Sequence, residues 1–109
     1  MIDNQKKTIA LIEKMKAHLP IPMVPTIKVY NMIHEKGVEI PKTHRFQIEK
    51  VHYLGDEGGI CCGISVPAGS EAAFVTSLTH LRIKPGHLLF KEIKRYQTRR
   101  INKLARQHQ

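Results

Sequence analysis

Two glycine-containing separators constrain the fold most, because they divide residues 46–83 into three runs with the composition of strands. The separators are GDEGG at 55–59 and PAGSE at 67–71. Hairpin loops need glycine where the backbone adopts a positive φ, and both separators supply it. The pattern predicts an antiparallel meander of three strands, at about residues 46–54, 60–66 and 73–83.

Helical patterns lie on both sides of this meander. Before it, apolar residues recur every three or four positions after a capping Asp or Asn at 3–4. Three prolines within 20–25 then force an extended segment. A second helical run stops at Gly37, and a third follows the Pro-Gly pair at 85–86. The predicted helices cover residues 3–18, 26–36 and 87–106.

The order α-α-β-β-β-α predicts a single α+β domain, with a three-stranded antiparallel meander and a long basic C-terminal helix. At 109 residues the chain has no room for a second core. The N-terminus lacks the apolar stretch of a signal peptide, and no apolar run approaches the roughly 20 residues that cross a bilayer. We therefore expect a cytoplasmic protein with no membrane partner.

The two separators also predict a register for the strands. If GDEGG closes a hairpin with Gly55 opposite Ile60, Tyr53 lies opposite Cys62, and the next hairpin places Ile64 opposite Val75. One face of the sheet is then apolar throughout and should lie against helices. It carries Val51, Tyr53, Ile60, Cys62, Ile64, Val66, Ala73 and Val75.

The opposite face is mixed, which suits partial exposure, cover by one helix, or a subunit interface. Leu54, Phe74 and Leu78 are its candidate interface residues in a homodimer. The separator GDEGG itself is predicted to be a structural turn. Its acidic tip repels phosphate, and it matches no phosphate-binding motif.

His52, Cys61 and His80 share the mixed face in this register, and two histidines with one cysteine can bind zinc or copper. They come from three strands, however, without the close spacing typical of metal sites. A Cys61–His pair could also form a thiolate nucleophile, but it has no evident orienting carboxylate beyond Glu49 or Asp56. We therefore expect free thiols, no metal, no cofactor and no catalytic residue.

The positive charge is concentrated at the C-terminal end. Residues 82–109 hold nine Lys or Arg and one Glu, so they carry +8 of the net charge of +9. On a helical projection Leu89, Phe90, Ile93, Tyr96, Ile101 and Leu104 form an apolar stripe. Arg100 falls inside this stripe, where it either reaches outward to solvent or meets a carboxylate.

The remaining cations form a row that suits a phosphate backbone, or else a solvated face that keeps the protein soluble. The candidate nucleic-acid-binding residues are Lys84, Lys91, Lys94, Arg95, Arg99, Lys103 and Arg106. We favour non-catalytic binding of DNA or RNA through the C-terminal helix. The alternative is a homo-oligomeric interaction module, and a metal- or thiol-dependent enzyme ranks third.

Overall fold

Five strands form the sheet in the computed structural model, which describes residues 4–66 and 74–107. The strands lie in the order β4-β3-β2-β1-β5, and all neighbouring pairs are antiparallel. The strands are β1 Ile21–Pro25, β2 Gln47–Tyr53, β3 Ile60–Ile64, β4 Phe74–Ser77 and β5 Leu81–Ile83. The helices are α1 Gln5–Ala17, α2 Ile27–Glu35, the four-residue α3 Gly55–Gly58, the 3-10 turn η1 Leu78–His80 and α4 Phe90–Gln107. The α+β class is confirmed, but a sheet of three strands is wrong.

The first additional strand is the proline segment. β1 pairs with β2 through Ile21 and Pro22, and with β5 from Met23 to Pro25. Each half of β1 therefore has a ladder on one side, which tolerates proline much as a sheet edge does. The segment was predicted to be extended, and it is. The prolines gave no indication that it forms a strand inside the sheet, between β2 and β5.

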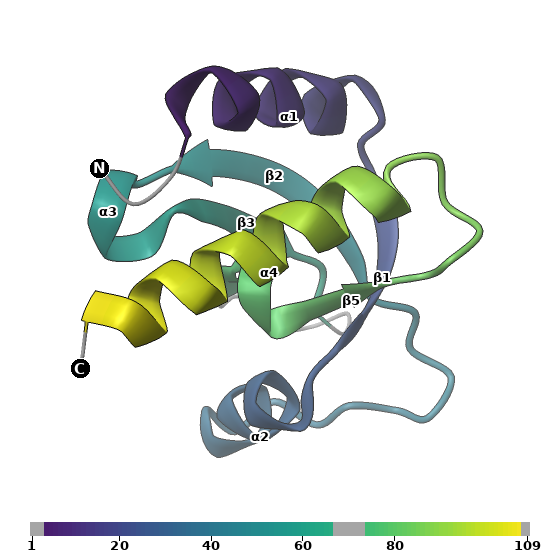
Figure 1. Ribbon diagram of the computed structural model, residues 1–109. Coiled ribbons are helices and arrows are strands. Elements are labelled where there is room, and N and C mark those ends of the chain that lie inside the picture. Colours follow the sequence, from purple (N-terminus) through teal and green to yellow (C-terminus); the bar gives the residue numbers. More distant parts are fainter. Residues whose placement is uncertain (1–3, 67–73, 108–109) are drawn as a thin grey trace.

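The second additional strand arises because the predicted strand 73–83 is two strands joined by η1. The Ser77 hydroxyl accepts a hydrogen bond from the Thr79 N–H at 3.3 Å, which starts this turn. β4 and β5 occupy opposite edges of the sheet. Four strand spacings amount to about 19 Å in a flat sheet, whereas the four Cα steps from Ser77 to Leu81 span at most about 15 Å. The sheet must therefore curl until its edges approach each other (Figure 1).

The register between β2 and β3 differs from the predicted one by two residues. Tyr53 lies opposite Ile60 and Val51 opposite Cys62. The cause is α3, a helical turn that takes up more of the chain than the tight turn predicted for GDEGG. A shift of two residues keeps Val51, Ile60, Cys62 and Ile64 pointing into the core. Tyr53, predicted on the same inward face, lies at the end of β2 and is 37% exposed.

The register between β3 and β4 differs by one residue, which exchanges the two faces. Phe74, and not Val75, lies opposite Ile64. Phe74 is consequently buried, while Val75 is 53% exposed. Residues 67–73 are outside the described part of the chain, and with them the predicted pairing of Ala73.

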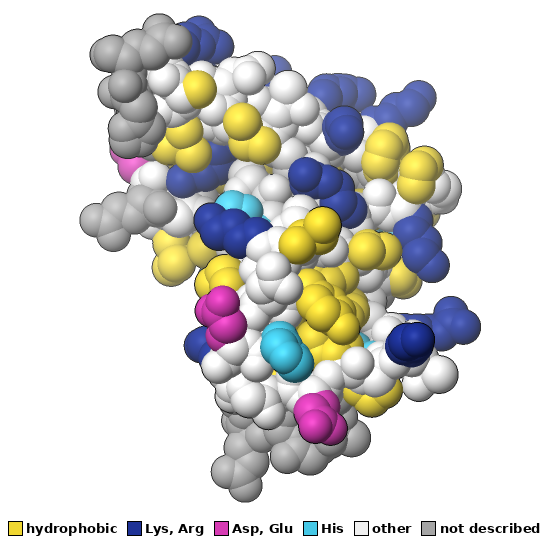
Figure 2. All heavy atoms as spheres, turned by 90° about the horizontal axis from the view of Figure 1, so that it is seen from below, with side chains coloured by type: hydrophobic (Ala, Val, Ile, Leu, Met, Phe, Trp, Pro, Cys, Tyr) yellow, Lys and Arg dark blue, Asp and Glu magenta, His cyan; other side chains and the backbone are white. Residues whose placement is uncertain are grey.

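The three longer helices cover the curled sheet from two directions. α1 and α4 lie side by side over it, and α2 lies at the other end of the molecule (Figure 1). The core combines Leu11 and Met15 of α1 with Val29 and Ile33 of α2 and with the inward residues of all five strands. On the face that carries α2, hydrophobic side chains gather in a patch among Lys, Arg and His (Figure 2).

Candidate nucleic-acid interface

α4 is fixed to the sheet by polar as well as apolar side chains. Leu89, Ile93 and Tyr96 are buried as the stripe predicts, but Ile101 is 49% exposed. On the inner face of the helix, one turn before Ile101, Gln97 is buried and only 7% exposed. The Gln97 amide donates to the backbone carbonyls of Leu78 and Leu81, both at 2.7 Å, and so holds α4 against η1.

Arg100 also turns inward and is only 3% exposed. Its Nη2 donates to the backbone carbonyl of Asp56 in α3 at 2.8 Å. One turn earlier, the Tyr96 hydroxyl accepts from the Ile60 N–H at 2.8 Å. Of the two alternatives that the sequence left open for Arg100, the inward one is observed, with a backbone carbonyl of the GDEGG segment as a partner. The segment thus supports α4.

Gly59 permits this close approach. Its φ is +62°, and a Cβ there would lie 2.7 Å from the Arg100 guanidinium carbon and would collide with the Tyr96 hydroxyl. Only glycine has both the conformation and the space that the position requires. The role of the loop is thus structural, and it fixes the direction of α4.

With its inner face held, α4 presents its cations outward. Lys91, Lys94, Arg95 and Arg106 are exposed, and Arg99 and Lys103 are half-buried. Lys84 lies apart from them, in a hollow beside β1. We call the six α4 residues, without Lys84, the α4 cations.

α1 adds further positive charge beside this row. A groove of about 370 Å³ runs between α1 and α4. Its lining residues are Lys7, Ala10, Leu11, Lys14, Glu92, Arg95 and Arg99. Lys7 and Lys14 are seven residues apart, a spacing of two helical turns, but nothing in the sequence places that face of α1 next to α4.

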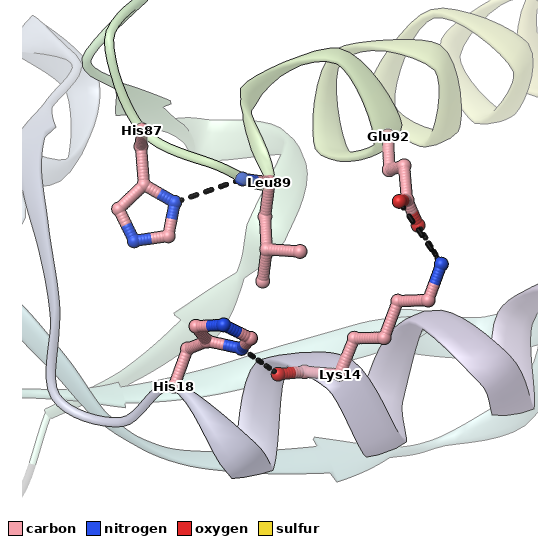
Figure 3. A network of polar contacts seen from close by, with 5 residues as sticks. All are labelled: Lys14, His18, His87, Leu89 and Glu92. Atoms are coloured by element: carbon pink, nitrogen blue, oxygen red, sulfur yellow. Dashed lines mark hydrogen bonds and ion pairs between the residues drawn. The ribbon is translucent and has the colours of Figure 1, made fainter.

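The carboxylate in the groove lining is already paired. The Lys14 ammonium lies 3.0 Å from both carboxylate oxygens of Glu92 and joins the two helices (Figure 3). Because both side chains are well exposed, this pair contributes little to stability, about 0–1 kcal/mol. Its main effect is to neutralise Glu92, which leaves Lys7, Arg95 and Arg99 as excess positive charge.

Two histidines lie at one end of the groove. His18 Nδ1 lies 2.8 Å from the Lys14 carbonyl oxygen, and His87 Nδ1 accepts from the Leu89 N–H at 3.0 Å (Figure 3). The two rings meet edge to face with centroids 6.3 Å apart. This contact joins the end of α1 to the start of α4, so the groove has a defined width.

The candidate metal residues do not converge. His52 lies directly opposite Cys61, but His80 lies in η1, where burial and then Lys28 and Arg82 lower its pKa. Within residues 4–66 and 74–107, no three or more His, Cys, Asp or Glu side chains are placed to hold a metal ion. The structure therefore does not bring the three side chains together.

Both cysteines are free and buried. Burial raises the pKa of Cys61, an effect that the nearby charge of Arg100 partly offsets. Burial, and to a lesser extent the neighbouring Cys61, raises the pKa of Cys62 to about 12. Thiols that stay protonated are poor nucleophiles, which argues against the thiolate hypothesis.

The candidate interface residues are mostly internal. Phe74 is 5% exposed and Leu78 is fully buried, so neither is available for self-association. The Lys36 ammonium covers the Phe74 ring at 5.4 Å from its centroid. Leu54 is exposed, but a single leucine does not make an interface.

Comparisons of this chain with protein-family models, with curated proteins and with solved structures find no match. Across the described residues, no helix has both the length and the apolar character needed to cross a membrane. Any functional assignment has to come from the residues themselves.

Proposed function

We propose that the protein binds nucleic acid, without catalysis, through the groove between α1 and α4 and the adjoining α4 cations. The observation that carries the proposal is the charge of the groove. Lys7, Lys14, Arg95 and Arg99 line it against Glu92, and Glu92 is paired with Lys14. A solvated face that served solubility alone would mix charges of both signs.

The geometry of α4 suits a phosphate backbone. Its 18 residues form a rod about 27 Å long, and its cations recur every three or four residues, about 5–6 Å apart. Gln97 and Arg100 hold the helix in place, so the row of cations is largely set before a ligand arrives. Long flexible side chains on a fixed helix can then follow phosphates of either DNA or RNA.

The groove lining lacks the amide side chains that read adenine, and its Lys and Arg side chains can bind phosphate as well as guanine. None of its lining residues is Asn or Gln, and its two apolar members are Ala10 and Leu11. We therefore expect affinity that depends weakly on sequence and falls steeply with salt. If four to six phosphates are neutralised, the log–log slope for duplex DNA is about −3.6 to −5.4.

Binding to a random-sequence duplex and to a single-stranded RNA, measured by fluorescence anisotropy at low salt, tests this proposal. Lys7→Glu should weaken binding about tenfold and reduce the salt slope by about one. Lys6→Glu is the matched control, because it makes the same charge change on the same turn of α1 outside the groove lining. It should have a clearly smaller effect.

Two outcomes would overturn the proposal. Either the parent protein binds neither nucleic acid at low salt, or Lys6→Glu and Lys7→Glu weaken binding equally. Light scattering on the same samples tests the alternative of a homo-oligomer. Phe74 and Leu78 are buried within the chain and cannot serve as its contact residues.

A further inference from the structure

A second hollow lies beside β1, away from the groove. It has a volume of about 490 Å³, within the range of about 300–1,000 Å³ typical of small-molecule sites. Its walls come from β1, from Tyr30 of α2, from residues 40–47 and from Lys84. We call it the β1 hollow.

Apolar groups make up somewhat more than half of the walls of the β1 hollow. Tyr30, Ile40 and Phe46 contribute the large side chains, and Tyr30 is 42% exposed. Three prolines stiffen the surrounding backbone, because their φ angles are fixed. They are Pro22, Pro25 and Pro41.

Internal contacts hold the wall formed by residues 44–47. The rings of His44 and Phe46 meet edge to face, with centroids 4.6 Å apart. The Phe46 carbonyl accepts from the Met23 N–H at 3.1 Å, and the Gln47 N–H donates to the Ser65 hydroxyl at 3.1 Å. The wall is therefore tied to β1 and to the segment after β3, and the hollow exists before any ligand binds.

The charge of the lining has one sign. Lys42, Arg45 and Lys84 line the hollow, and among the described residues no Asp or Glu lines it. The acid closest in sequence, Glu39, lines an adjacent hollow with His34. The adjoining hollow shares Tyr30, Ile40 and Pro41 with the β1 hollow, whose own lining suits an occupant that combines an apolar body with negative charge.

We propose that the β1 hollow binds a small organic anion. Its apolar or aromatic body lies against Tyr30, Ile40 and Phe46, and its carboxylate or phosphate group meets Lys42, Arg45 and Lys84. Ring stacking on Tyr30 and Phe46 favours a flat body, and cations at the rim orient its charged end. The proposal is independent of nucleic-acid binding, because the two sites share no lining residue.

Four probes separate the parts of the proposal. 1-Naphthoate and 1-naphthyl phosphate carry the same ring with different anionic groups, 1-naphthalenemethanol carries the ring alone, and inorganic phosphate carries the charge alone. Titrations of the full chain, followed by amide NMR shifts, give affinity and location together. One or both naphthyl anions should bind at least tenfold more tightly than the alcohol and inorganic phosphate. The tighter of the two identifies the preferred anionic group. Their amide shifts should map to the lining residues that carry an N–H, namely 23, 24, 30, 40, 42, 44–47 and 84.

Variants test the two halves of the site. Arg45→Glu with Lys84→Glu should weaken the naphthyl anions at least tenfold, whereas Lys28→Glu with Lys50→Glu, an equal charge change outside the lining, should not. Tyr30→Ala should weaken binding severalfold, and Met32→Ala is its control. Met32 lies on the same helix, is similarly exposed and does not line the hollow.

Three results would overturn the proposal. The first is equal binding of inorganic phosphate and the naphthyl anions, and the second is equal binding of the alcohol. The third is a set of shifts that maps to α1 and α4 or fails to saturate. A protein that binds nucleic acid but no naphthyl anion would refute this inference alone, and the reverse result would refute only the proposed function.

Discussion

The groove between α1 and α4 and the β1 hollow are both lined by cations, but their walls differ. In the groove, the apolar lining consists of Ala10 and Leu11. In the β1 hollow, aromatic, aliphatic and proline side chains make up most of the lining. Cations on a polar wall attract any dense row of phosphates, whereas cations around an apolar wall select anions that also carry an apolar body. Positive charge alone therefore does not define one ligand class for this protein.

The two sites depend on one core, so the largest expected effect is the loss of both. Phe74→Asp places a charge opposite Ile64 inside the core, which costs several kcal/mol of the roughly 5–15 that stabilise such a domain. Val75→Asp introduces the same charge on the exposed face and should leave the free energy of unfolding within about 0.5 kcal/mol of that of the parent. Thermal denaturation of both variants checks this. Equal melting would mean that the register between β3 and β4 is wrong.

A change at Gly59 should separate the two sites. Gly59→Ala pushes a Cβ into Tyr96 and Arg100 at a positive φ, so we expect a loss of about 2–4 kcal/mol and a displaced α4. Gly55→Ala also has a positive φ but meets no atom within 4 Å, and should cost about 1 kcal/mol. Urea denaturation measures both losses. Under conditions in which the variant stays folded, Gly59→Ala should lower the affinity for nucleic acid more than the affinity for naphthyl anions. An equal loss of both affinities would contradict the prediction that this change separates the two sites.

Charge reversal on α4 should affect the groove without a cost to folding. Replacing Arg95, Arg99 and Lys103 with Glu removes outward cations and leaves the inner face intact. Nucleic-acid affinity should fall at least a hundredfold at low salt, since each phosphate contact is worth about tenfold. The melting temperature and the affinity for naphthyl anions should be nearly unchanged. A comparable loss of naphthyl-anion affinity would show that the β1 hollow responds only to net charge.

The smallest effect concerns the thiols, which report on the α4 side of the molecule. Cys61 Sγ lies 3.6 Å from the Gly58 carbonyl in the loop that supports α4, and Cys62 is fully buried with its pKa raised to about 12. Both should label slowly at neutral pH, with Cys61 the faster, and labelling should accelerate as the pH rises and the thiolate forms. Mass spectrometry after timed alkylation measures the two rates. Gly59→Ala should accelerate Cys61, whereas Tyr30→Ala should not, and equal rates at Cys61 and Cys62 in the parent would count against this packing.

Periodicity in the sequence predicted the helices and the strands at 46–54 and 60–66 because these elements follow one local pattern. Prediction from periodicity failed where one sequence pattern continued across the boundary between two structural elements. Residues 74–83 keep the composition of a strand through η1, which starts where the Ser77 hydroxyl accepts a hydrogen bond from the Thr79 N–H. The prolines of β1 concealed a strand because its two partners, β2 and β5, lie far away in the sequence.

The sites were less predictable than the fold. The α4 cations followed from charge and helical spacing, but Gln97 and Arg100 bind backbone carbonyls 16 to 44 residues away, which no side-chain pattern reveals. Lys7 and Lys14 line the groove only because α1 lies beside α4, an arrangement that the sequence does not indicate. The lining of the β1 hollow comes from four separate stretches of chain, so no local motif could have indicated it.

The pairing of β1 with β5 also governs the order in which the chain can fold. β1 is made well before β5, and Met23, Val24 and Pro25 find their partners only when residues 81–83 have been synthesised. Until then that side of β1 is an open edge, which can recruit strands from other chains. Contacts so distant in sequence are also slow to close. During synthesis, the sheet should therefore remain incomplete on that side of β1 until residues 81–83 have emerged.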